Sequence, residues 1–141
     1  MKLQIRPFEI HDKASVIKLW IDCGLVVPWN NPEYDIQRKL EIQPELFLIA
    51  SSANQIIATI MAGYDGHRGW INYLAVHPQQ RRSKIGMQMV TEAENRLRKK
   101  GCPKINLQVR SANKDAIRFY KSIGFQKDDV VSLGKRLHSD Q

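Results

Sequence analysis

Cysteine is scarce in this sequence, and long apolar runs are missing from it. The two cysteines, Cys23 and Cys102, lie far apart and in no metal-ligand spacing, so we expect two free thiols, no metal site and a reducing compartment. No apolar stretch approaches the roughly 20 residues that a membrane helix needs, and the charged first residues lack the apolar core of a signal peptide. These absences predict a cytoplasmic protein with no membrane partner.

Internal repeats, low-complexity tracts and linkers are also missing. The chain has 141 residues, of which 43% are hydrophobic and 26% charged, which is ordinary for a globular protein. Compact domains typically hold about 50 to 250 residues. We therefore expect one domain over residues 1–141.

Acidic residues are scarce in one half of the chain. Residues 1–70 hold seven Lys and Arg against eight Asp and Glu, whereas residues 71–141 hold fifteen against six. The basic half would attract a polyanion, either a nucleic acid or a phosphorylated cofactor. Because aromatic residues are not interleaved with the basic ones, as a base-stacking surface requires, we favour the cofactor and expect no nucleic-acid partner.

Hydrophobic periodicity and turn residues predict elements in the order β-α-α-β-β-β-α-β-α-β. Strands are expected at 3–6, 46–51, 56–64, 70–76 and 105–109, with one or two more over 125–137. Helices are expected at 12–24, 31–42, 85–100 and 113–124. This order predicts an α/β (α+β) fold, a mixed and mostly antiparallel sheet of about six to seven strands with about four helices.

A basic loop over residues 78–84 runs from a strand into a long helix. The first turn of a helix has unpaired backbone N–H groups, and its dipole favours negative charge, so the loop is suited to phosphate oxygens. Arg81, Arg82 and Lys84 add positive charge there, and Gly86, without a Cβ, allows an anion close to the backbone. The alternative is a solvated basic loop before an ordinary helix.

A second segment places an amide and a phenol on one face of a helix. At about 100° per residue, Asn113 and Tyr120 face the same way nearly two turns apart, with the small Ala116 between them. Phe119 and Ile123 are placed to pack inward. This face is suited to a ligand, and the alternative is a capping Asn beside a half-buried Tyr.

Together these segments resemble the GCN5-related N-acetyltransferase (GNAT) superfamily. The family pattern Gln/Arg-x-x-Gly-x-Gly/Ala, which follows the fourth strand and grips the coenzyme A pyrophosphate, is similar to residues 81–86. Lys84 replaces its first glycine and can still donate its backbone N–H if its φ stays negative. The later pattern, Asn-x-x-Ala-x-x-x-Tyr-x-x-x-Gly-Phe, matches without a gap Asn113, Ala116, Tyr120, Gly124 and Phe125.

Three further stretches resemble a narrower group, the small stand-alone bacterial YpeA-like acetyltransferases. They are residues 28–33, 63–69 and 132–137. We infer no particular acceptor from this likeness, so a small-molecule amine and a peptide amine both stay open. A homodimer is left open as well.

The resemblance implies acetyl-coenzyme A as co-substrate, without a metal, in a V-shaped opening between splayed fourth and fifth strands. Exposed backbone near residues 74–76 would pair with the pantetheine arm and stabilise the oxyanion as a neutral amine attacks the thioester directly. Tyr120 would hydrogen-bond the departing sulfur and protonate it as general acid. The coenzyme-binding residues implied are Leu74, Ala75, Val76, Arg81, Arg82, Ser83, Lys84, Ile85, Gly86, Met87, Asn113, Ala116 and Tyr120.

The acceptor side and the general base are less defined by the sequence. The acceptor residues implied are Trp29, Asn30, Glu33 and Asp35 between the first two helices, and Asp65 in a turn. Positions where the family often places a Glu hold Trp70 and Gln108. The base stays unassigned among Asp65, His67, His77, Glu33 and Asp35, and a water chain or an already neutral amine would need none. The competing interpretation is a catalytically weak or inactive acyl-coenzyme A-binding protein of the same fold.

Overall fold

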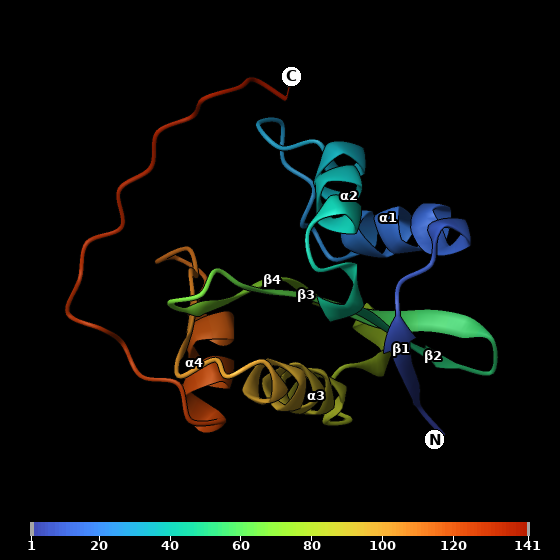
Figure 1. Cartoon of the computed structure of the whole chain (residues 1–141). Helices are drawn as coiled ribbons and strands as arrows, with labels where there is room; N and C mark the ends of the chain where they lie inside the picture. Colours follow the sequence, from blue (N-terminus) through green and yellow to red (C-terminus); the bar gives the residue numbers. More distant parts are fainter. Residues whose placement is uncertain (1, 141) are drawn as a thin grey trace.

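A five-stranded sheet forms the centre of the molecule, in the spatial order β1-β2-β3-β4-β5 (Figure 1). The computed structural model describes residues 2–140. The strands are β1 (Gln4–Pro7), β2 (Phe47–Ser52), β3 (Gln55–Tyr64), β4 (Gly69–Val76) and β5 (Ile105–Leu107). Neighbours from β1 to β4 pair antiparallel, and β5 pairs parallel with β4. The mixed, mostly antiparallel sheet predicted from the sequence is confirmed.

Two helices cover each face of the sheet (Figure 1). They are α1 (Lys13–Asp22) and α2 (Pro32–Glu41) on one face, and α3 (Ile85–Lys99) and α4 (Lys114–Ser122) on the other. Short 3-10 turns occur at η1 (Ile10–Asp12), η2 (Pro44–Leu46) and η3 (Pro78–Gln80). Two asparagines cap helices: the Asn31 side chain accepts from two N–H groups of α2, and the Asn113 side chain accepts from Ala116 N–H, whereas Asp12, at the start of α1, makes no side-chain cap bond.

The sheet is buried on both faces, which explains the continuous apolar run in β2. Phe47 and Ile49 pack with α1 and α2, whereas Leu48 and Ala50 pack with α3. Successive side chains of a strand point to opposite faces. A strand covered on both sides therefore has no polar positions to alternate with.

The strands predicted over residues 125–137 are wrong. Residues 126–140 follow an irregular path from α4 back towards α2, and their apolar side chains are solvent-exposed, Leu133 at 91% (Figure 1). This tail touches the β5 region through side chains, Lys104 with Asp128 and Gln108 with Ser132. Because β5 has only three residues, it offers too short an edge for a further ladder, so the described part of the sheet has five strands.

Strands β4 and β5 diverge along their length, as predicted. Their pairing runs from Gly69–Ile105 to Ile71–Leu107, where β5 ends, while β4 continues to Val76. The last residues of β4 therefore have a ladder partner on the β3 side alone among residues 2–140. This divergence opens the sheet beside α3 and α4.

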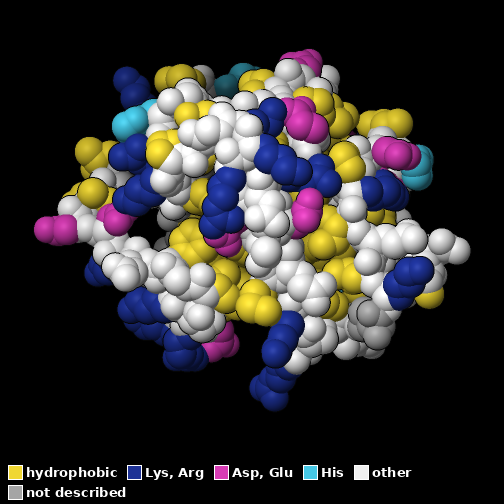
Figure 2. Space-filling view, turned by 60° about the horizontal axis from the view of Figure 1, so that its bottom comes forward, with side chains coloured by type: hydrophobic (Ala, Val, Ile, Leu, Met, Phe, Trp, Pro, Cys, Tyr) yellow, Lys and Arg dark blue, Asp and Glu magenta, His cyan; other side chains and the backbone are white. Residues whose placement is uncertain are grey.

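Charge is uneven over the surface. On the face that carries α3 and α4, dark blue Lys and Arg side chains are more prominent than magenta Asp and Glu (Figure 2). No helix within residues 2–140 is both long and apolar enough to cross a membrane.

Candidate active site

A β-bulge in β4 lies at the opening of the sheet. Met61 pairs with Asn72 and Thr59 with Ala75, so Tyr73 and Leu74 together face a single residue of β3. Tyr73 has a φ of 50°, a left-handed conformation that costs a non-glycine residue about 1–2 kcal/mol. A bulge leaves its extra residue outside the ladder and redirects the neighbouring side chains.

Three contacts hold Tyr73 in this conformation. Its ring stacks on Trp20 of α1 with centroids 3.8 Å apart, and its hydroxyl donates to Asp35 Oδ2 of α2 at 2.6 Å. Trp20 Nε1 donates to Thr59 Oγ1, which donates to the Tyr73 carbonyl, both at 2.9 Å. Burial and, next, the bond to Asp35 raise the pKa of Tyr73 far above its usual range. The bulge is therefore fixed to both helices of one face by satisfied polar groups.

The basic loop lies between β4 and α3, and its backbone is unusual. Arg82 and Lys84 have φ of 68° and 64°, and Lys84 is the N-cap residue of α3. Donation by the Lys84 backbone N–H was expected at a negative φ, and this condition is not met. The conformation that a glycine would adopt freely is thus imposed on a lysine.

Side chains of the loop are exposed and partly engaged with β4. The Val76 carbonyl accepts from Arg81 Nε at 3.3 Å and from Cys23 Sγ at 3.3 Å, which occupies both acceptor sites of that oxygen. Ser83 donates to the Gln80 carbonyl. Pairing of a ligand with the Val76 carbonyl therefore requires the Arg81 side chain to move.

Gly86 brings three elements together. A Cβ at this position would lie 3.2 Å from Phe119 Cζ of α4 and 3.8 Å from Val76 Cγ2 of β4. The Phe119 ring therefore occupies the space in which a side chain at position 86 would lie. The sequence predicted an anion-binding role for Gly86 and not this packing role. Ile85 beside it is buried, so only its backbone is available to a ligand.

Tyr120 lies on α4 between two aromatic rings, with centroids 5.1 Å from Phe119 and 5.4 Å from Phe125. It packs with Leu74 and Val76 against the core cluster that includes α3. Burial raises the pKa of Tyr120 to about 12, so the phenol is protonated at neutral pH. Its hydroxyl has no hydrogen-bond partner within residues 2–140, and it remains available to a ligand.

The residues expected on the acceptor side do not share one contact network. Trp29 is 45% exposed and lies under the Arg110 guanidinium, 5.0 Å from the ring centroid. Asn30 accepts from Arg136 of the tail. Asp35 contacts the bulge through Tyr73, while Glu33 lies 3.7 Å from Lys13 on the outer side.

Among the base candidates, two have clear structural roles. Asp65 accepts from the N–H groups of His67 and Arg68 at 2.8 and 2.7 Å and from Trp70 Nε1 at 3.3 Å, and the backbone N–H groups are the main cause of its lowered pKa. His77 accepts from Gln79 N–H through Nδ1, which caps η3. The remaining candidate contacts do not select one base.

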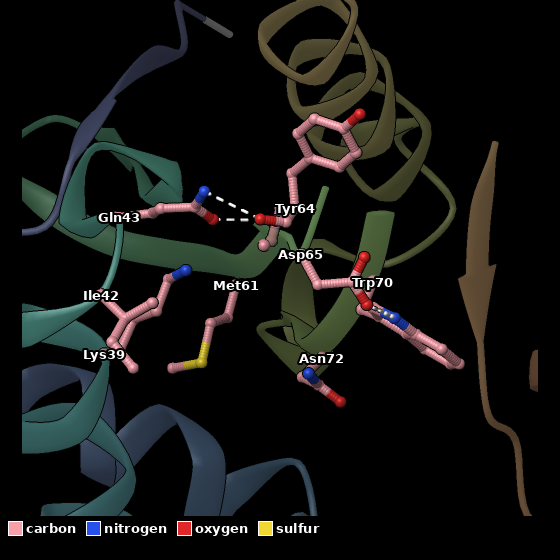
Figure 3. Close-up of a pocket in the computed structure, with 10 residues that line it drawn as sticks. Lys39, Ile42, Gln43, Met61, Tyr64, Asp65, Trp70 and Asn72 are labelled. Carbon is pink, nitrogen blue, oxygen red and sulfur yellow. Dashed lines mark hydrogen bonds between the residues drawn. The ribbon is translucent and has the colours of Figure 1, made fainter. Parts of the chain in front are cut away.

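A pocket of about 240 Å³ lies between α2, β3 and β4 (Figure 3). Lys39 and Met61 lie on one side of it, and Asp65, Trp70 and Asn72 on the other. Sequence reasoning missed Lys39, Asn72 and Tyr73 as site residues. The available signal was spacing: Lys39 follows the apolar Ile36 by three residues and so lies on the inward face of α2.

Comparison with known proteins agrees with this geometry. Residues 13–125 match the model of the acetyltransferase (GNAT) family. Proteins named acetyltransferase from Sodalis glossinidius and Yersinia enterocolitica are 46% and 44% identical over 140 and 139 residues, covering 99% of both chains in each case.

A solved structure is similar as well. A chain from the crystal structure of the NatC complex bound to Gag peptide and CoA superposes with a TM-score of 0.77 at 26% identity, covering 91% of this chain and 87% of that one. The family match spans the helices, the bulge and the divergent strands together. This chain belongs to the acetyltransferase (GNAT) family and is an acyltransferase.

Proposed function

We propose that this protein transfers the acetyl group of acetyl-coenzyme A to an amine by direct attack of the amine on the thioester. The observation that carries the proposal is the divergence of β4 from β5 after Ile71, next to α4 and the basic loop. A coenzyme with an anionic pyrophosphate and an amide-containing arm requires both features, because one end needs cations and the other needs unpaired backbone.

The residues present fit that coenzyme. Arg81, Arg82 and Lys84 are exposed at the start of the long helix α3, where N–H groups and the dipole also favour an anion. Ser83 and Met87 adjoin this position in the chain, and Asn113 and Ala116 lie at the start of α4, which meets Gly86 through Phe119; all four are exposed or half-buried. Arg81 would exchange its bond with the Val76 carbonyl for one with the pyrophosphate, which would free β4 for the pantetheine arm.

The bulge supplies the group that the oxyanion requires. A backbone N–H near Leu74, outside the ladder, would donate to the developing oxyanion. Because the network of Trp20, Tyr73 and Asp35 fixes the bulge, this donor would be positioned before the substrates bind. Fixed donors of this kind typically contribute about 10²–10³ in rate.

Tyr120 would donate a hydrogen bond to the sulfur as the thioester breaks. A phenol with a pKa of about 12 is a weaker acid than a free thiol, whose pKa is about 8.5. Net proton transfer from Tyr120 to the thiolate is therefore uphill, and stabilisation by the hydrogen bond is the larger part of its role. No side-chain base is required if the amine arrives neutral.

The test is coenzyme binding and thiol release by matched variants. The double variant Arg81→Gln, Arg82→Gln should raise the calorimetric Kd for acetyl-coenzyme A by roughly tenfold to hundredfold, with a weaker salt dependence. The control is Arg98→Gln, Lys99→Gln, which removes two charges from the other end of α3 and should leave the Kd unchanged.

Two outcomes would contradict the proposal. Equal Kd changes in both double variants would remove the loop from coenzyme binding. Saturable binding by the wild type without thiol release, over a broad panel of amines, would favour a binding-only protein.

A further inference from the structure

The pocket between α2 and the β3–β4 hairpin contains Lys39, a largely buried lysine whose ammonium opens to the pocket and has no partner within residues 2–140. Lys39 is only 9% exposed, yet its ammonium forms no hydrogen bond or salt bridge within residues 2–140. Burial lowers the pKa of Lys39, and the acid whose charge opposes this shift, Glu45, is already paired with Lys100 at 2.8 Å. A buried charge without a partner is costly unless a ligand compensates it.

The surroundings of Lys39 are built and leave room beside the ammonium. Gln43 Oε1 accepts from Tyr64 N–H at 2.8 Å and Gln43 Nε2 donates to the Tyr64 carbonyl at 2.9 Å, so this wall is fixed and does not neutralise the lysine. Gly63 adds no side chain, and even a Cβ there would stay 3.6 Å from Lys39 Nζ. Figure 3 shows the ammonium between Gln43 and Met61, within the pocket.

The opposite wall indicates the charge of the ligand. Asn72 offers a neutral amide that can donate or accept, whereas both oxygens of Asp65 already accept, Oδ1 from the turn backbone and Oδ2 from Trp70 Nε1 of β4. One free cation facing one carboxylate suits a singly charged anion better than a phosphate, which Asp65 would repel more strongly. The pocket is therefore suited to a carboxylate.

The pocket also adjoins the bulge. Trp70 and Asn72 lie on the same side of β4, two residues apart, and Tyr73 and Leu74 follow directly. Two residues of a strand span about 7 Å, so a molecule with its carboxylate at Lys39 would extend along β4 to the bulge. This places the anion pocket within the reach of a small acceptor.

We propose that Lys39 binds a carboxylate of the acceptor, so that the acceptor is an amine that also carries a carboxylate. This inference rests on the proposed acetyl transfer at the bulge. It names a class of substrate, amino acids or peptide-like acids, and makes Lys39 a residue that selects for them.

The experiment compares acids with their amides. The amines are glycine, 4-aminobutyrate and 6-aminohexanoate, each beside its carboxamide, and thiol release gives kcat/KM. For at least one length the wild type should prefer the acid by tenfold or more, because a hydrogen bond to a charged group typically gives roughly tenfold to hundredfold discrimination.

Lys39→Met should remove that preference, lowering kcat/KM for the acid and changing it less than about twofold for the amide. Methionine keeps much of the length of the side chain without the charge, so the fold should be retained. Lys18→Met, on the exposed surface of α1, is the matched control and should change neither. An equal loss for acid and amide in Lys39→Met would overturn the inference.

A binding measurement separates this inference from the proposed function. Calorimetry of the wild type with coenzyme A should show N-acetylglycine or its longer homologues binding at least fivefold more tightly than their amides, whether or not any amine is acetylated. Equal binding of acids and amides overturns the carboxylate pocket. Thiol release with amides alone also overturns it, while leaving acetyl transfer intact.

Discussion

The two sides of the opening differ in how their polar groups are satisfied. On the α1–α2 side, Trp20, Thr59, Tyr73 and Asp35 form one continuous hydrogen-bonded and stacked network. On the α3–α4 side, the basic loop is exposed, and the Tyr120 hydroxyl has no partner within residues 2–140. The network from Trp20 to Asp35 is satisfied by its own members, whereas the basic loop and the Tyr120 hydroxyl leave polar groups open to a ligand.

This contrast implies that stability and ligand binding are separable. A satisfied, buried network contributes to the free energy of unfolding, and its loss should be seen without any substrate. Exposed cations contribute little to stability and act mainly on an anionic partner. Substitutions in the network from Trp20 to Asp35 and substitutions around the basic loop and Tyr120 should therefore change different quantities.

The largest effect is expected at Trp20. Trp20→Ala removes a fully buried ring, its stack on Tyr73 and its bond to Thr59, so the free energy of unfolding should fall by about 3–5 kcal/mol. Chemical denaturation measures it. The control is Trp29→Ala, at a half-exposed ring, which should lower the free energy of unfolding by less than about 1 kcal/mol. Similar losses of unfolding free energy in both variants would show that the Trp20 network does not stabilise the fold.

Tyr120→Phe tests the other side through kcat. We expect kcat to fall roughly tenfold to hundredfold, because one hydrogen bond to a developing charge is lost, while KM for acetyl-coenzyme A and the unfolding free energy change little. Tyr34→Phe, at an exposed tyrosine of α2, should match the wild type.

The pKa of Tyr120 adds a pH criterion to the same experiment. Since burial raises it to about 12, ionisation of Tyr120 should cause no loss of rate below pH about 10. A fall in wild-type rate between pH 8 and about 10 that is absent from Tyr120→Phe would contradict the assignment.

The sequence predicted most elements because their signals are local. The caps Asn31 and Asn113 and the four-residue spacing from Ile85 to Leu97 fix helices without reference to the rest of the chain. The strand predicted over 125–137 failed because a strand needs a partner edge, and β5 is too short to provide it. No local pattern reports the length of a neighbour.

The candidate site shows the same limit. Tyr120 and the basic loop were predicted from motif spacing, and the structure brings α4, the start of α3 and the end of β4 together through Gly86. The contact between Tyr73 and Asp35 depends on a bulge, and the burial of Lys39 depends on how α2 lies on the sheet. Both are tertiary properties, so neither Tyr73 nor Lys39 was selected from the sequence, although Asp35 was.

A smaller effect is expected at Lys84, where a substitution can relieve the backbone strain of the basic loop. Lys84→Gly and Lys84→Ala both remove the charge, but only glycine adopts a φ of 64° freely. The glycine variant should be more stable than the alanine variant by about 1 kcal/mol, measured by chemical denaturation, and should bind coenzyme A more tightly. Equal stability of the two variants would mean that the loop does not impose this φ in solution.

The smallest effect is expected for the tail, residues 126–140, which runs from α4 back towards α2 and is held there by Asp140. Asp140 accepts from Arg38 at 3.1 and 2.8 Å, and this pairing is the main reason that the pKa of Asp140 lies well below its usual range. A lowered carboxylate pKa favours the bound tail above the ordinary pKa of about 4, and this contribution is lost as the pH falls through the lowered value.

Asp140→Asn should therefore speed tryptic cleavage after Arg136 severalfold at pH 7.5, with an unchanged unfolding midpoint. The control Asp129→Asn, at an exposed position of the same tail, should be cleaved at the wild-type rate. Equal cleavage of both variants would show that the pairing of Asp140 with Arg38 does not hold the tail against α2.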